Sequence, residues 1–263
     1  MNYKLALAGL ALSVSSIANA ALIGLSSADV DTGKVYSIDP ITGQATELAS
    51  LGLTSLVGAT FLDGKFYGTD VCSNPCFSMG EIDINNGDYT ALNNQDGSAN
   101  WHGLASNESL GLMYAIDLND NNILKSINAA GDVTSIGTGT GISASGMAFD
   151  DLNDILYSTD FSGNLYSVDI ITGTSSLIGN MGISSSLLGL AFDEVNQTLF
   201  ANNSSSLYSI DTTSGTASLI GSNGVFGIDG LAWIDTTTKV PEPTTLVMLS
   251  LGLFGLASRK SKK

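Results

Sequence analysis

A pattern that recurs five times is the feature that most limits how this chain can fold. Each copy approximates an apolar-Tyr-Ser-Ile-Asp strand, a Thr-Gly turn, a Ser/Thr-rich strand, a Gly-Leu-Ala-Phe strand and a Leu-Tyr strand. One polar residue ends the first strand of every copy, at spacings of 44, 45, 41 and 42 residues: Asp39, Asp83, Asn128, Asp169 and Asp211. Alternation with a period of two inside each copy indicates β-strands.

The length of the repeat predicts the architecture, because 40 to 45 residues accommodate the four short strands of one propeller blade. We therefore expect an all-β fold, a β-propeller of five four-stranded blades with the Gly-Leu-Ala-Phe strands innermost. The fifth copy stops after Asp235 without its Leu-Tyr strand, and residues 21–27 can supply it. Pairing of that N-terminal strand with the last inner strand would close the ring. An open solenoid is the alternative, and a sixth blade would need a unit that the sequence lacks.

The turn after each marker residue follows from simple stereochemistry. Gly43, Gly173 and Gly215 stand at one offset from their markers, where a tight hairpin requires a positive φ. The marker aspartates are expected to accept hydrogen bonds from N–H groups of the same turn. We therefore interpret these aspartates as structural.

The distribution of charge excludes several classes of ligand. The formal net charge is −16, and residues 21–239 hold four lysines and no arginine against 24 acidic residues. Such a surface would repel nucleic acid and makes phosphorylated metabolites poor ligands. Divalent cations, neutral glycans and basic partners remain open, and solubility alone would also explain the charge.

The two ends of the chain have the character of targeting segments. Residues 1–20 comprise a short basic start, an apolar run and the small-residue site Ala18-Asn19-Ala20, which predicts a Sec signal peptide cleaved after Ala20. Residues 21–239 form the predicted propeller domain. Residues 240–263 begin with Val240-Pro241-Glu242-Pro243, continue with a 15-residue apolar run and end in a basic tail. As a helix that run would span about 22 Å, enough for a temporary transmembrane stop with the cations in the cytoplasm.

This C-terminal segment resembles the PEP-CTERM sorting signal, which combines a Val-Pro-Glu-Pro motif, an apolar helix and a basic tail in this order. The resemblance covers only the last 24 residues. It implies recognition by an exosortase, a membrane transpeptidase, in a Gram-negative host that makes exopolysaccharide. The implied location is the inner membrane at first, and then the outer surface or the extracellular matrix.

Polar residues at the ends of predicted strands suggest one ligand site. Inner strands begin, and second strands end, at the same face of a propeller, so these side chains should gather at one mouth of the channel. Oxygen ligands there could hold Ca²⁺, although the same residues could simply form turns. Gluconolactonase- and paraoxonase-like propellers bind calcium at a comparable place, but their motifs are absent here. The candidate residues are His102, Asp229, Asp70, Asp117, Asp160, Asn202 and Asn203.

Two further features bear on chemistry. Cys72 and Cys76 are the only cysteines, and an oxidising compartment predicts a local disulfide between them. His102 is the only histidine, and the equivalent positions in the other copies are Val57, Ser145, Leu188 and Asp229, so no chemical role repeats there, which favours a structural or channel-lining role. We find no phosphate loop, nucleophile elbow or zinc-protease signature.

Three functions remain after these exclusions. The first is a non-enzymatic surface or matrix protein that binds exopolysaccharide or another surface protein. The second is a calcium-dependent lactonase or ester hydrolase that acts at the channel mouth. The third is a structural surface protein without a ligand. No catalytic residue is predicted.

Overall fold

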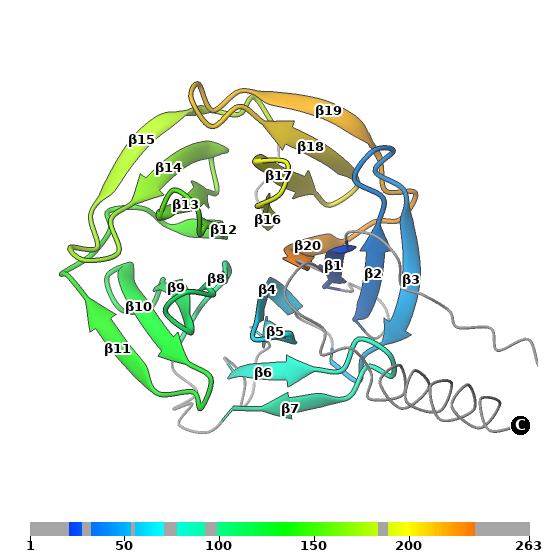
Figure 1. Ribbon diagram of the computed structural model, residues 1–263, viewed down its shortest axis with the longest axis horizontal. Helices are drawn as coiled ribbons and strands as arrows, with labels where there is room; N and C mark the ends of the chain where they lie inside the picture. Colours follow the sequence, from blue (N-terminus) through cyan, green and yellow to red (C-terminus); the bar gives the residue numbers. More distant parts are fainter. Residues whose placement is uncertain are drawn as a thin grey trace, which may run out of the picture.

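The computed structural model describes residues 21–27, 33–53, 56–70, 78–92, 99–183 and 189–234. These residues form five antiparallel four-stranded sheets arranged as the blades of a ring (Figure 1). The prediction of an all-β propeller with five blades is therefore confirmed. The predicted signal peptide, the two cysteines and the sorting segment lie outside the described residues.

Each blade contains four strands, ordered from the innermost to the outermost. Blade 1 contains β20 (Ile228–Ile234), β1 (Ala21–Ser26), β2 (Lys34–Ile38) and β3 (Ala45–Ser50). Blade 2 contains β4 (Leu56–Leu62), β5 (Lys65–Asp70), β6 (Ser78–Ile82) and β7 (Tyr89–Ala91). Blade 3 contains β8 (Ala105–Asn107), β9 (Leu112–Asp117), β10 (Ile123–Asn128) and β11 (Val133–Ile136). Blade 4 contains β12 (Ala144–Asp150), β13 (Ile155–Asp160), β14 (Asn164–Val168) and β15 (Ser175–Asn180). Blade 5 contains β16 (Gly189–Asp193), β17 (Thr198–Asn203), β18 (Ser206–Ile210) and β19 (Ala217–Ser222).

Blade 1 is built from both ends of the described chain, as predicted. Strand β1 pairs with β20 on one side and with β2 on the other, and Ala21 lies opposite Ile234. This pairing gives both edges of β1 a partner and leaves no gap in the ring, which excludes the solenoid. Because every blade is complete within residues 21–234, this part of the chain closes on itself.

The marker residues form the hairpin turns that the sequence predicts. Asp39 Oδ1 accepts the N–H groups of Ile41 and Thr42 at 2.8 and 3.2 Å. Asp169 and Asp211 accept equivalent pairs. The following glycine has a φ of +77° at Gly43, and the same left-handed backbone recurs in the other copies. Backbone N–H groups therefore hold the pKa of Asp39, Asp169 and Asp211 below the ordinary value.

The hydrophobic core is divided among the five junctions between blades. Each of the five buried clusters draws side chains from two neighbouring blades. An aromatic residue of an inner strand stacks on an aromatic residue of the preceding blade at three of these junctions: Phe149 on Tyr114, Phe192 on Tyr157 and Trp233 on Phe200. Adjacent blades are thus joined by apolar packing at equivalent places.

Candidate functional site

The five inner strands come closest to one another at a ring of glycines. A Cβ atom on Gly103 would lie 2.8 Å from the backbone of Gly146, and one on Gly189 would lie 2.7 Å from the carbonyl oxygen of Asp229. The ring consists of Gly58, Gly103, Gly146, Gly189 and Gly230. Only glycine permits such an approach of backbones, so these positions narrow the channel along the axis.

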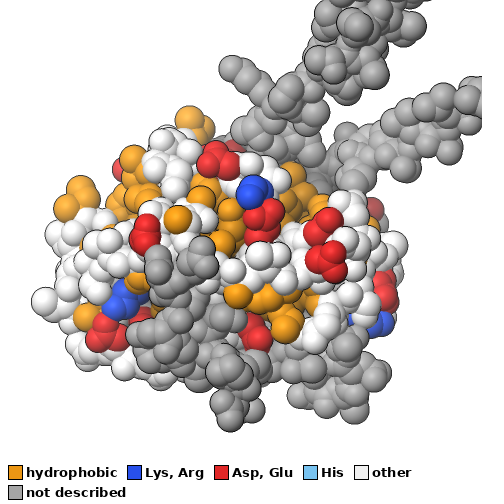
Figure 2. All heavy atoms as spheres, turned by 90° about the horizontal axis from the view of Figure 1, so that it is seen from below, with side chains coloured by type: hydrophobic (Ala, Val, Ile, Leu, Met, Phe, Trp, Pro, Cys, Tyr) orange, Lys and Arg blue, Asp and Glu red, His pale blue; other side chains and the backbone are white. Residues whose placement is uncertain are grey.

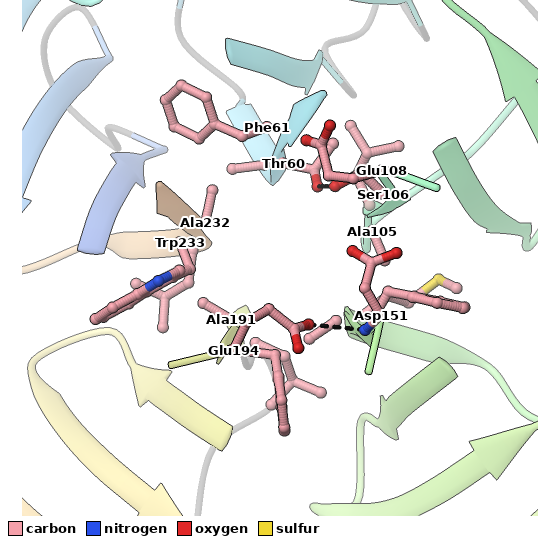
Figure 3. Close-up of a pocket in the computed structure, with 18 of the residues that line it drawn as sticks. Thr60, Phe61, Ala105, Ser106, Glu108, Asp151, Ala191, Glu194, Ala232 and Trp233 are labelled. Atoms are coloured by element: carbon pink, nitrogen blue, oxygen red, sulfur yellow. Dashed lines mark hydrogen bonds between the residues drawn. The ribbon is translucent and has the colours of Figure 1, made fainter. Parts of the chain in front are cut away.

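A pocket of about 460 Å³ begins beyond the glycine ring and opens at the face where the inner strands end. We call this cavity the axial pocket and this side of the ring the pocket face. Figure 3 shows side chains from every blade around it. Its inner wall is apolar and comes from equivalent positions of the five inner strands: Ala59, Leu104, Ala105, Met147, Ala148, Leu190, Ala191, Leu231 and Ala232.

One side of the axial pocket departs from this apolar pattern. Blade 2 has Thr60 where the other blades have alanine, and blade 3 has Ser106 where the others have an aromatic residue. The two hydroxyl groups meet across the blade junction, with Thr60 donating to Ser106 at 2.9 Å (Figure 3). The hydroxyl groups of Thr60 and Ser106 therefore satisfy each other by hydrogen bonding, and they form a polar pair in the otherwise apolar wall.

Carboxylates from three of the five blades lie at the mouth of the axial pocket. Glu108, Asp151 and Glu194 follow the inner strands of blades 3, 4 and 5 at one equivalent position. In Figure 3 their carboxyl groups lie beside the opening, each directed along the ring toward the preceding blade. Because a strand advances about 3.3 Å per residue, these groups lie nearer the opening than the apolar side chains that precede them.

The same carboxylates connect each blade to the preceding one. Glu108 Oε2 accepts the backbone N–H of Asp63 at 3.1 Å, and Glu194 Oε1 accepts that of Asp151 at 2.7 Å. The backbone N–H groups of Glu108 and Ser109 face the carboxylate of Asp151 in the same way and offset part of the rise that burial causes in its pKa. Part of the role of these carboxylates is thus structural.

In Asp151 and Glu194, one of the two carboxylate oxygens accepts no such hydrogen bond from the neighbouring blade. Asp151 Oδ1 and Glu194 Oε2 are buried and have no hydrogen-bond partner among the described residues. Burial raises the pKa of both side chains above the ordinary value, and neighbouring carboxylates increase the shift. The rim therefore holds negative charge in a poorly solvated position.

The predicted channel-mouth residues lie at the opposite face, and none of them lines the axial pocket. Asp70 is paired with Leu56, Asp160 with Ala144 and Asn202 lies opposite Gly189, so second-strand ends meet inner-strand starts there. Asp229 accepts hydrogen bonds from Ser27 and Ser204. Asn202 donates to the carbonyl oxygen of Ile228, next to Asp229, and this brings these two predicted residues together.

Several of the other predicted residues are engaged in local structure. Asp117 accepts the N–H groups of Asn100 and Asn119, and Asp160 accepts those of Ser162 and Asn164. Asn203 accepts the N–H groups of residues 205 and 206. Asp70, although buried, also has an interaction partner.

The environment of His102 is apolar. Its ring packs edge-on against Phe161 at 5.4 Å, and burial lowers its pKa. Within the described ranges, no three His, Cys, Asp or Glu side chains are arranged to hold a metal ion. The turn bonds of Asp117 and Asp160 fit the turn-forming interpretation, and calcium binding stays a prediction.

Other predicted features fall outside what the structure describes. The disulfide between Cys72 and Cys76 and the motif Val240-Pro241-Glu242-Pro243 both stay at the level of sequence. No helix in the described part of the chain is long and apolar enough to cross a bilayer.

The repeat also contains a signal for the rim. The fifth residue after every inner-strand glycine is acidic, which gives Asp63, Glu108, Asp151, Glu194 and Asp235. A carboxylate after a strand is usually a turn former, so the regularity alone does not distinguish a rim from a set of turns.

Comparisons with known proteins agree with both parts of this description. A model of the PEP-CTERM protein-sorting motif matches residues 239–263. No curated protein sequence matches the chain. A chain from a crystal structure of a nidogen/laminin complex is similar in fold, with a TM-score of 0.56 and 16% identity over 79% of this chain and 80% of that chain. A protein of unknown function from Bacteroides thetaiotaomicron VPI-5482 has a TM-score of 0.48 and 14% identity over 76% of this chain and 58% of that chain.

The similarity to the nidogen/laminin chain concerns the fold alone, whereas the motif match concerns how the protein is handled by the cell. The chain is a five-bladed β-propeller protein with a C-terminal PEP-CTERM motif, which marks it as an exported protein that exosortase sorts toward the cell surface.

Proposed function

We propose that the mature protein is a non-enzymatic binding protein of the exopolysaccharide matrix of a Gram-negative bacterium, and that the axial pocket is its binding site. The observation that carries this proposal is the pocket itself, which combines an apolar wall with a carboxylate rim. A cavity of about 460 Å³ is in the range that binds ligands in other proteins, roughly 300 to 1,000 Å³.

The chemistry of the lining supports binding rather than catalysis. The hydroxyl groups in the wall, Thr60 and Ser106, bond to each other, and no histidine or lysine lines the pocket to activate them. The only histidine of the chain, His102, is at the opposite face. One chain of similar fold comes from a structure of a two-protein complex, which is a precedent for the shape only.

The test uses residues 21–239, because the ring closes within residues 21–234. The purified ring is immobilised, and matrix extract from a Gram-negative host of PEP-CTERM proteins is passed over it. Retained sugar and retained protein are measured separately. A matched control carries Glu47→Gln and Asp120→Asn, which remove two exposed charges away from the pocket. We expect retention by the wild type and the control. Retention of nothing refutes the proposal, and shortening of the polysaccharide during incubation refutes the non-enzymatic role.

A further inference from the structure

Exposed apolar side chains are concentrated on the pocket face. Leu110, Leu152 and Val195 stand in the turns that follow the inner strands, next to the rim carboxylates, and are 56%, 72% and 63% exposed. Ile41 and Ile171 stand in the third hairpins of their blades at the same face, and both are 85% exposed. Apolar side chains gathered on one face in this way mark an interaction surface.

Asp151 and Glu194 have no lysine, arginine or histidine beside them among the residues that line the axial pocket. The three lysines that the structure describes are already paired: Lys34 with Glu47, Lys65 with Glu81 and Lys125 with Asp120. In the view of Figure 2 the lysine atoms accordingly lie against acidic atoms. The charge of the rim is thus uncompensated inside the ring.

This arrangement has an energetic cost that a ligand could remove. Asp151 and Glu194 each keep one buried oxygen without a hydrogen-bond partner among the described residues. Placing negative charge beside an apolar wall is unfavourable unless a cation or a donor satisfies it. A cationic group at the mouth would compensate the charge of both carboxylates, which line the pocket, while leaving the hydrogen bond from Asp151 N–H to Glu194 intact.

The order of groups along the axis determines what kind of cation fits. The carboxylates lie at the opening, and aliphatic side chains such as Leu104, Met147 and Leu190 lie deeper. A ligand must therefore insert an apolar group first and keep its positive charge at the rim. A sugar unit of a polysaccharide would instead place hydroxyl groups against the aliphatic wall, where they would find few partners.

We propose that the pocket face binds a partner protein, which inserts an apolar side chain into the axial pocket and places a flanking lysine or arginine on Asp151 and Glu194. This inference rests on the proposed function and specifies the partner of the same site. The exposed side chains of Leu110, Leu152 and Val195 would surround the anchor and exclude water from the charge pair, as the rim of a protein interface does.

The test measures binding of fluorescent heptapeptides to residues 21–239 by anisotropy at low and physiological salt. The probe is Gly-Ser-Lys-Leu-Lys-Ser-Gly, acetylated and amidated. Two matched peptides replace its leucine by alanine or both lysines by glutamine. Each change should weaken binding at least about tenfold, the equivalent of ~1.4 kcal/mol, because one removes the anchor and the other the charge.

The matched protein variants separate the pocket from net charge. Asp151→Asn with Glu194→Gln keeps an oxygen acceptor for each N–H group and should weaken the probe at least about tenfold. Glu47→Gln with Asp120→Asn changes net charge equally and should leave binding unchanged. Thermal melts verify that all variants fold.

The outcomes are distinguishable from those of the retention experiment. Equal loss in both double variants, or equal affinity for the leucine and alanine peptides, overturns the inference. Tighter binding of glucosamine oligomers than of the peptide, lost in the Asp151→Asn, Glu194→Gln variant, also overturns the inference, because it assigns the site to an amino sugar. Retention of matrix material without peptide binding overturns the inference and leaves the proposed function intact.

Discussion

The closing strand β1 offers the sharpest test of the fold. Leu25 is fully buried in the cluster between blades 1 and 2, where it packs with Ile23 and residues of β4. Leu22 points the other way and joins the cluster between blades 5 and 1. One strand therefore contributes to two cores, as alternation along a strand requires.

Replacing Leu25 by alanine should destabilise the ring substantially. A buried Leu→Ala change costs about 2 to 5 kcal/mol, against a total stability of about 5 to 15 kcal/mol for a domain. At about 2 to 4 °C per kcal/mol for a domain of this size, the melting temperature should fall by about 4 to 20 °C. Leu48→Ala is the matched control, because Leu48 lies on β3 of the same blade and is 40% exposed. It should shift melting by about 2 °C or less.

Tryptophan fluorescence is the suitable assay for this comparison. Trp233 lies on β20 directly opposite Leu22 of β1, so its emission reports on closure. Equal shifts for Leu25→Ala and Leu48→Ala would show that β1 is not part of the ring and would refute the argument for closure.

Three further predictions concern charge, metal and backbone. The pKa values of Asp151 and Glu194 are raised in the folded state. Between the ordinary and the raised pKa, the folded state therefore binds more protons than the unfolded state, and the free energy of unfolding falls as pH rises through this window. The Asp151→Asn, Glu194→Gln variant should therefore melt above the wild type at pH 7, and this advantage should vanish below about pH 4; thermal melts across pH check it, and an advantage independent of pH contradicts it. If the strand-end aspartates only form turns, millimolar calcium should not raise the melting temperature relative to chelator, whereas a calcium site at 100 times its dissociation constant would add about 2.7 kcal/mol. Gly173→Ala should destabilise by more than about 1 kcal/mol in urea, because φ is +72° and the new Cβ would lie 2.5 Å from the oxygen of Ile136, while Gly52→Ala meets nothing within 4 Å and should be neutral.

The sequence predicted the ring because its determinants are local. Period-two alternation, the marker aspartates and the glycines with positive φ each act within a few residues, so they can be recognised without knowing the fold. Closure by β1 was also predictable, since the fifth repeat lacks one strand and residues 21–27 provide it.

The axial pocket could not be located in the same way. The end of the channel at which the pocket forms depends on where the five inner strands come closest to one another. That place is set by glycines in different blades, such as Gly103 and Gly189. The bonds from Asp63 N–H to Glu108 and from Asp151 N–H to Glu194 join residues about one repeat apart. Such contacts depend on the register between blades, which a single sequence does not display.

The pairing of Ala21 with Ile234 also determines how the molecule can be oriented on a surface. Both residues lie at the pocket face, so the polypeptide arrives at and departs from the ring at one point beside the axial pocket. The matched sorting motif starts only five residues after Ile234, a tether of about 17 Å at full extension. An attachment made at the motif would therefore keep Ile234, and with it the mouth of the axial pocket, within that distance of the attachment point. Processing by exosortase at the motif would remove this restriction on the pocket face.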